Sequence, residues 1–234
     1  MTMRICVLGN SHVAALKEGW DSIRAAHPGV DLVFFASRAD RMRGMTAVDG
    51  CLVAANASLE RDIAFTSGGR AKVVPSDFDL FLICGGLMVP RLDRRLSSAV
   101  QMAVVEDVLA ASLAAPLARK LRSVSERPIW LLPTPRRTAP PGVATSLATC
   151  LRYAEVHAML AARIDLAPMR LVAQPAHTMP DGWHSAEHFS RGSKRLDIGD
   201  SLSGALHEAT DVWHMNGDYG RVCLEDILPA LHAA

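Results

Sequence analysis

The sequence predicts a doubly wound, flavodoxin-like α/β fold, in which a parallel sheet is covered by helices on both faces as a three-layer sandwich. Short apolar runs rich in β-branched and aromatic residues alternate with longer runs rich in Ala and Leu. The short runs are apolar almost throughout, as expected for strands that are buried on both faces. The chain has 234 residues, of which 50% are apolar, and no repeat or low-complexity linker divides it. A single domain over residues 1–234 is therefore expected.

The strand candidates are short runs bounded by Gly, Pro or Asp: "RICVLG" (4–9), "DLVFFAS" (31–37), "FDLFLICGG" (78–86), "RPIWLLPTP" (127–135) and "MRLVAQP" (169–175). The helix candidates are residues 11–27, 97–124, 143–164 and 219–232. Pro116 is expected to kink or divide the second of these helices. Residues 38–77 and 174–218 are rich in Gly, Asp, Ser and His, which predicts long loops with short elements inside them.

Composition excludes several classes of function. The net charge is +1, the aromatic fraction is 5% and the arginines are scattered, so no nucleic-acid-binding surface is expected. The five cysteines are odd in number and form no C-x-x-C pair, which indicates small buried side chains in a reducing compartment. No apolar stretch approaches 18 residues, so no membrane association is expected and a cytoplasmic location is predicted.

Ser11 lies where a ligand site is expected. In a doubly wound sheet, ligands bind beyond the carboxyl ends of the strands, where helix N-termini point. Gly9 lets the chain turn after the first strand, and the N–H groups of the first helical turn favour nearby negative charge. A serine at this position can act as a nucleophile if a base is within reach. The alternative is that Ser11 or Asn10 only caps the helix.

A candidate base lies near the other end of the chain, in "TDVWHMNGDYG" (210–220). Asp211 precedes His214 by three residues, directly before a polar turn and the last helix. An aspartate at this spacing can fix one imidazole nitrogen by a hydrogen bond, which leaves the other nitrogen to act as a general base.

Together, "GNSH" with Ser11 and "DVWH" with Asp211 and His214 resemble the first and last motifs of the SGNH (GDSL-type) hydrolase superfamily. "MNGDYG" is similar to a continuation found in some members. The resemblance implies an SGNH-like three-layer sandwich with a Ser11–His214–Asp211 triad and no cofactor.

The resemblance also implies an oxyanion hole made from the N–H groups of Ser11 and Gly44 and from an asparagine side chain after the third strand. No asparagine is present in "LICGGLMVP" (82–90), so the N–H groups of Gly85 and Gly86 are the expected substitutes. Asn10 replaces the usual aspartate of the first motif. Asn10 and His12 are expected to line the substrate site rather than to act as acid or base.

A rival acid–base pair exists in "HTMPDGWHSAEH" (177–188), where Asp181 and His184 have the same spacing. Asp211 and His214 are preferred because a single helix follows them, and the rival segment is then expected to line or flank the pocket. The same stretch offers further potential ligands, namely His177, His188 and Glu187, but their spacing matches no zinc pattern, so no metal is expected.

Two arginine clusters, "RLDRR" (91–95) and "PRRT" (135–138), follow predicted strands on the edge where substrate binds. Surface solvation explains them, although they could also recognise a carboxylate or a phosphate. The glycine pairs at 68–69 and 85–86 match no nucleotide-binding motif.

The expected function is that of a serine esterase acting on a small-molecule ester or an acylated sugar. Two alternatives remain open: transfer of the acyl group to a second alcohol, and a low-activity or non-catalytic binding protein that has lost the hole's asparagine.

Overall fold

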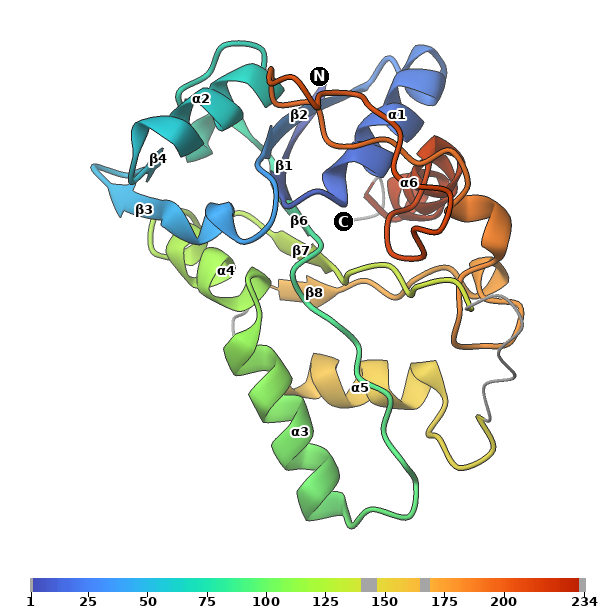
Figure 1. Ribbon diagram of the computed structural model, residues 1–234. Coiled ribbons are helices and arrows are strands. Elements are labelled where there is room, and N and C mark those ends of the chain that lie inside the picture. The colour runs from blue at the N-terminus through green and yellow to red at the C-terminus, as the bar shows by residue number, and fades with distance from the viewer. Residues whose placement is uncertain (1, 140–146, 165–168, 232–234) are drawn as a thin grey trace.

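The central element of the computed structural model is a five-stranded parallel sheet (Figure 1), and the structure describes residues 2–139, 147–164 and 169–231. The strand order is β2-β1-β6-β7-β8. These strands are β1 (Met3–Gly9), β2 (Val30–Ala36), β6 (Leu80–Cys84), β7 (Ile129–Leu132) and β8 (Met169–Leu171). Counted within this sheet alone, the order is the flavodoxin-like 2-1-3-4-5. The predicted fold class and all five predicted strands are confirmed.

Alternation along each strand divides the core into two layers. In β1, Ile5 and Val7 face one layer, whereas Cys6 and Leu8 face the other, and all four side chains are buried. Successive side chains of a strand point to opposite faces, so a strand covered on both sides must be apolar at every position. This requirement is the reason that the strands read as continuous apolar runs in the sequence.

Helices cover both faces of the sheet (Figure 1). On one face lie α1 (Val13–Ile23) and α6 (Gly217–Leu231), which pack on each other. On the other lie α2 (Ala57–Thr66), α4 (Ala114–Arg122) and α5 (Tyr153–Arg163). Helix α3 (Ser98–Ala111) packs against α5.

In three segments the structure adds detail to the sequence-based expectation or corrects its bounds. Residues 38–77 contain α2 and a small antiparallel sheet of β3 (Met45–Val48), β4 (Cys51–Ala54) and β5 (Lys72–Val73). The helix predicted over 97–124 is divided between Ala111 and Ala114, upstream of Pro116. The helix predicted over 143–164 begins only at Tyr153, because residues 147–152 are not helical, and residues 143–146 lie outside the described part of the chain.

Two glycines bring α1 and α6 into backbone contact. A Cβ atom on Gly220 would overlap the carbonyl oxygen of Ala15, and one on Gly19 would overlap the backbone at Arg221. A side chain at either position would therefore push the helices apart. Because His214 lies three residues before α6 and Ser11 two residues before α1, this crossing sets the distance between them.

Gly220→Ala is expected to lower the free energy of unfolding by about 1–3 kcal/mol, the usual cost of forcing an extra carbon into a packed interior. Denaturant unfolding of the purified variant measures this change. Gly29→Ala is the matched control, since a Cβ at Gly29 meets no atom within 4 Å and its stability should stay near that of the wild type. Equal stability of the two variants would contradict the close crossing.

The five cysteines are unpaired, and Cys6, Cys84 and Cys223 are buried. Those three have the expected role of small apolar side chains, whereas Cys51 and Cys150 are partly exposed. Among the described residues, no single helix is both long and apolar enough to cross a membrane; α3 and α4 meet that standard only as a pair bent by 64°.

Candidate functional site

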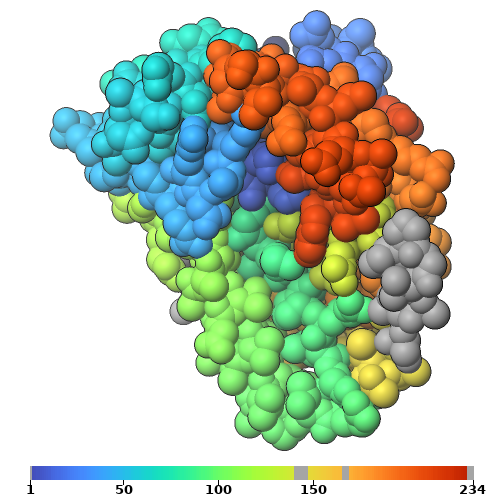
Figure 2. Space-filling view, viewed as in Figure 1, coloured from blue at the N-terminus to red at the C-terminus, as the bar shows by residue number. Residues whose placement is uncertain are grey.

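The candidate site lies where the strand order of the sheet reverses, between the carboxyl ends of β1 and β6. A hollow of about 440 Å³ opens there, beside the turn that follows β1. Figure 2 shows it as a depression in which dark-blue N-terminal atoms lie deep between blue, green and red-orange segments. Its described lining consists of Asn10, His12, Asp40, Arg43, Gly86, Met88, Val108, Ala111, Ser112, Leu113, Thr134 and Trp213.

Ser11 does not cap α1. The residue before the first helical turn is His12, and no side chain accepts a capping hydrogen bond there. The Asn10 Oδ1 instead accepts from the His12 N–H at 3.2 Å. The Ser11 hydroxyl lies 3.1 Å from His214 Nε2. The side chain that could have capped the helix is therefore directed at an imidazole more than 200 residues away in the sequence.

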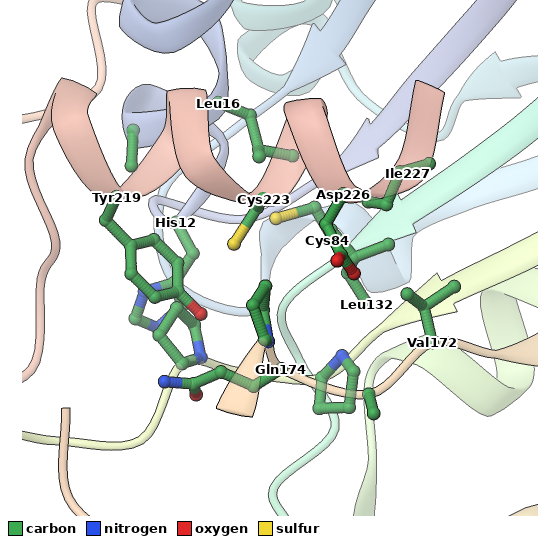
Figure 3. Close-up of a pocket in the computed structure, with 15 residues that line it drawn as sticks. His12, Leu16, Cys84, Leu132, Val172, Gln174, Tyr219, Cys223, Asp226 and Ile227 are labelled. Carbon is green, nitrogen blue, oxygen red and sulfur yellow. The ribbon is translucent and has the colours of Figure 1, made fainter. Parts of the chain in front are cut away.

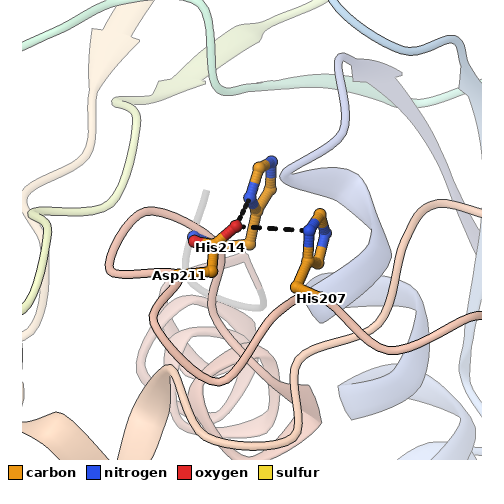
Figure 4. Close-up of side chains that lie close together, drawn as sticks. All are labelled: His207, Asp211 and His214. Carbon is orange, nitrogen blue, oxygen red and sulfur yellow. Dashed lines mark hydrogen bonds and ion pairs between the residues drawn. The ribbon is translucent and has the colours of Figure 1, made fainter.

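His214 is held by Asp211, as the three-residue spacing predicted (Figure 4). The His214 Nδ1 is 2.8 Å from Asp211 Oδ2, while Asp211 Oδ1 accepts from the backbone N–H groups of Trp213 and His214. The carboxylate thus fixes both the loop and the ring. With the proton of the neutral ring on Nδ1, Nε2 is left as an acceptor for the Ser11 hydroxyl.

The Asp211 carboxyl group stays ionised near neutral pH. Burial raises its pKa, but the hydrogen bonds from the His214 backbone and ring and from the Trp213 backbone outweigh burial, and the net shift is downward. An ionised acceptor at Nδ1 keeps the imidazole in one tautomer and stabilises the ring when it gains a proton. The arrangement can therefore move a proton from Ser11 to His214.

His207 is the site residue that the sequence did not reveal. Its Nδ1 lies 3.2 Å from the same Asp211 Oδ2, and its ring stacks on that of His214 with centroids 3.9 Å apart and an angle of 8° (Figure 4). Burial, followed by the charge of His214, lowers the pKa of His207 to about 4. A neutral His207 therefore holds Asp211 without adding positive charge. No local sequence pattern marks it, because the segment between His207 and Asp211 forms no helix or strand.

His12 flanks His214 on another side, with ring centroids 5.2 Å apart. Burial first and the charge of His214 second lower the pKa of His12 to about 3, so it is neutral and a poor proton acceptor. His12 also lines a small apolar cavity under α6, which Figure 3 shows between Leu16, Cys84 and Cys223. That cavity, about 20 Å³, holds roughly one water molecule and is too small for an acyl chain.

Acidification is expected to destabilise the protein through these two neutral histidines. A histidine whose pKa falls from 6.5 in the unfolded chain to about 4 or 3 on folding binds fewer protons when folded. The free energy of unfolding should therefore fall between pH 7 and pH 5, by about 1–2 kcal/mol for each imidazole. Denaturant unfolding at both pH values should show a smaller fall in His207→Gln than in the wild type. An identical fall in both proteins would contradict the lowered pKa of His207.

The rival pair has the same local structure. Asp181 Oδ1 accepts from the backbone N–H groups of Trp183 and His184, and its Oδ2 lies 2.7 Å from His184 Nδ1. His184, however, is buried, and its Nε2 contacts no polar partner among the residues that the structure describes. The described lining of the hollow beside Ser11 contains neither Asp181 and His184 nor Asp211 and His214. What separates the two pairs is the contact with the Ser11 hydroxyl, which only His214 makes.

The glycines differ in what their N–H groups can do. The Gly85 N–H donates to the Leu132 carbonyl at 3.0 Å, so the prediction that Gly85 supplies a free donor is wrong. The Gly86 N–H makes no hydrogen bond within the described residues, and Gly86 lines the hollow. Gly44 lies in a 3-10 helix, Arg41–Gly44, and a Cβ there would face Leu59 rather than the hollow.

Asn10 is the one side-chain amide in the described lining of the hollow. Its Oδ1 is used by the His12 N–H, whereas its amide nitrogen donates to none of the described residues. An amide donor is thus present beside the serine, although no asparagine follows β6.

Asn216 anchors the loop that carries His214. Its side-chain amide donates to the carbonyls of His188 and Arg191, and its Oδ1 accepts from the Tyr219 N–H at the start of α6. Tyr219 itself is buried and packs edge-on against Phe189. The "MNGDYG" stretch therefore joins the 187–191 loop to α6.

In the described part of the chain, one cluster has the composition of a metal site: His207, Asp211 and His214, whose ligand atoms lie within 4.8 Å of one another. Asp211 Oδ2 already lies within hydrogen-bond distance of both imidazoles, so a metal ion would have to replace both contacts. The potential ligands of the 177–188 segment form no such cluster among the described residues.

No family model and no curated protein matches the chain. Solved structures that are similar to it include two bacterial proteins. One is the periplasmic domain of a lipopolysaccharide acetyltransferase from Salmonella ser. Paratyphi A, with 10% identity, a TM-score of 0.49, and coverage of 99% of this chain and 84% of that chain. The other is a DUF4886 family protein from Bacteroides uniformis, with 10% identity, a TM-score of 0.36, and coverage of 94% and 79%. Likeness at this level assigns neither a family nor an activity.

Proposed function

We propose that the protein is an acyl hydrolase of the SGNH type that cleaves small esters with Ser11 as the nucleophile. The observation that carries this proposal is the 3.1 Å contact between Ser11 Oγ and His214 Nε2, with Asp211 fixing the opposite ring nitrogen at 2.8 Å. A nucleophile, a base and a group that orients the base are together what covalent acyl transfer requires.

In the proposed reaction, Ser11 Oγ attacks the ester carbonyl carbon while its proton passes to His214 Nε2. The C–O bond to the leaving alcohol then breaks, and the alcohol takes the proton from His214. Water repeats the sequence on the acyl-enzyme, releasing the acid and restoring Ser11. Asp211 keeps its charge throughout and stabilises the imidazolium.

The oxyanion that forms on the carbonyl oxygen needs hydrogen-bond donors. We assign this role to the backbone N–H groups of Ser11 and Gly86 and to the amide of Asn10, which all lie at the end of β1 or β6 beside the hollow. Preorganised donors of this kind contribute about 10²–10³ each to kcat in acyl-transfer enzymes. Asn10 would then supply the amide donor that an asparagine after β6 was expected to supply.

Acyl transfer to an alcohol is the second candidate activity. The 440 Å³ hollow is large enough for a sugar-sized group, and a second hollow of about 290 Å³ shares Met88, Thr134 and Trp213 with it. An acceptor alcohol seated there would compete with water for the acyl-enzyme.

The test is turnover of p-nitrophenyl acetate by the purified protein, with and without an added sugar whose hydroxyl groups can accept the acetyl group. Release of p-nitrophenolate together with acetate supports hydrolysis, and acetylated sugar detected by mass spectrometry supports transfer. Absence of release in both conditions would favour the non-catalytic binding protein and contradict the proposal.

A further inference from the structure

A second hollow adjoins the candidate site and is rimmed by arginines. Its described lining is Met88, Val89, Pro90, Arg91, Thr134, Pro135, Arg136, Arg137 and Trp213, with a volume of about 290 Å³. None of these residues is acidic, and three carry a guanidinium group. Positive charge gathered around a concave surface attracts anions more strongly than the same charge spread over a flat one.

The three guanidinium groups have no carboxylate partner among the described residues. Arg91 makes no hydrogen bond or ion pair there at all. Arg137 lies over the Trp213 ring at 5.4 Å. Arg136 is buried and donates to the carbonyl oxygens of Val89 and Trp183.

Among the described residues, no carboxylate forms an ion pair with the buried Arg136 guanidinium. Burial, and then the charge of Arg91, lower the pKa of Arg136 to about 10, and the group still remains protonated at neutral pH. The Asp181 carboxylate, which forms no ion pair with Arg136, raises this pKa in part and is itself hydrogen-bonded to His184. A buried cation is costly unless an anion accompanies it. An anionic ligand in the hollow would supply that partner.

The arginine-rimmed hollow adjoins the hollow beside Ser11, the candidate nucleophile. Met88, Thr134 and Trp213 line both hollows, and Trp213 directly precedes His214. A molecule whose ester lies at Ser11 can therefore extend past Trp213 towards the arginines. Trp213 has 42% of its surface exposed, which offers an aromatic face for a sugar ring between the two sites.

From these observations we propose that the arginine hollow, formed by Arg91, Arg136 and Arg137, binds the carboxylate or phosphate of an anionic, acylated sugar whose ester is cleaved at Ser11. This inference rests on the proposed function for the position of the ester, and it adds the chemical class of the substrate. Guanidinium groups suit such ligands because their planar N–H pairs match carboxylate and phosphate oxygens.

The test compares kcat/KM for three acetyl esters: acetylated glucose, acetylated glucuronate and acetylated glucose 6-phosphate. The wild type should prefer at least one anionic ester over the neutral one by about tenfold or more, the usual value of one charge-assisted contact. Arg91→Gln should reduce that preference about tenfold, and added salt should weaken it. Arg95→Gln is the matched control, because Arg95 is in the same loop, pairs with Asp93 and lines neither hollow. Which anionic ester is preferred distinguishes a carboxylate from a phosphate ligand.

Binding measured without turnover separates this inference from the proposed function. Glucuronate and inorganic phosphate are titrated calorimetrically into Ser11→Ala and into Ser11→Ala combined with Arg91→Gln. Cleavage of the neutral ester without any anionic preference would overturn the arginine hollow and leave the esterase intact. Anion binding that weakens with Arg91→Gln, in a protein whose wild type cleaves no ester, would support the hollow and overturn the esterase. If the protein shows no anion binding and no ester turnover, both the arginine hollow and the esterase are overturned.

Discussion

Ser11→Ala is expected to lower kcat for p-nitrophenyl acetate by about 10⁴–10⁶, the range seen when a serine nucleophile is removed from an otherwise intact site. The hydroxyl is the atom that attacks the carbonyl, and no other serine hydroxyl lies within hydrogen-bond distance of His214 among the described residues. The measurement is initial-rate kinetics on the purified variant. A loss below about tenfold would show that another group carries the reaction.

The same variant should keep its stability, which separates loss of chemistry from loss of fold. Ser11 Oγ contacts only His214 through a hydrogen bond in the described structure, so its removal should change the free energy of unfolding by about 1 kcal/mol or less. Ser22→Ala is a matched control: its hydroxyl bonds only to the Gly19 carbonyl on the same helix, and activity should match the wild type.

His214→Ala is expected to lower kcat by a similar factor, about 10⁴–10⁶, whereas His184→Ala should retain activity within about tenfold. The two histidines share sequence context and local hydrogen bonding, but only His214 lies at hydrogen-bond distance from Ser11. Kinetics of the two variants, alongside their unfolding free energies, make the comparison. His184 is buried, so His184→Ala is expected to lose stability, while the molecules that remain folded still hydrolyse the ester.

Substitution of the two aspartates extends this comparison. Asp211→Asn replaces the acceptor of the His214 ring proton with an amide that can present a donor, so the wrong tautomer faces Ser11 and kcat should fall by about 10³–10⁴. Asp181→Asn makes the same change at His184 and should leave kcat near the wild-type value. If only Asp181 and His184 prove essential for turnover, His184 is the general base and the assignment of His214 is wrong.

The strands could be predicted because their physics is local. A strand covered on both faces has to be apolar at every position, so it can be recognised in the sequence as a continuous apolar stretch such as Ile5–Gly9. Within 38–77 only unspecified short elements could be predicted, because each helix or strand there is short and bounded by polar turn residues. Helix α2, for example, spans only Ala57–Thr66 and shows a buried face of Leu59, Asp62, Ile63 and Thr66, which mixes apolar and polar side chains.

The break between α3 and α4 lies before Pro116 because a proline is tolerated in the first turn of a helix. A proline in the first turn of a helix needs no hydrogen-bond partner for its nitrogen, so a helix can begin just before it. Pro116 is the third residue of α4, and the Ser112 hydroxyl accepts from the Ala115 N–H ahead of it. The break therefore lies upstream of Pro116, between α3 and α4.

The candidate site was only partly predictable, for a physical reason. The D-x-W-H sequence encodes a local turn in which aspartate binds the backbone and the ring, and this turn forms at both Asp181 and Asp211. Which copy meets Ser11 depends on the crossing of α1 and α6, a tertiary feature set by Gly19 and Gly220. The engaged N–H of Gly85 likewise depends on a contact distant in sequence. His207 lies only four residues before Asp211, but the segment between them forms no helix or strand, so no periodic pattern marks it.

The most direct test of the central claim is covalent labelling of the wild-type protein with a fluorophosphonate probe, followed by mass spectrometry of the peptides. The probe reacts with a serine hydroxyl only when a nearby base activates it. One adduct is expected, on Ser11, that disappears in Ser11→Ala and in His214→Ala and persists in His184→Ala. An unlabelled wild type, or an adduct that survives in Ser11→Ala, would contradict the claim that Ser11 is an activated nucleophile.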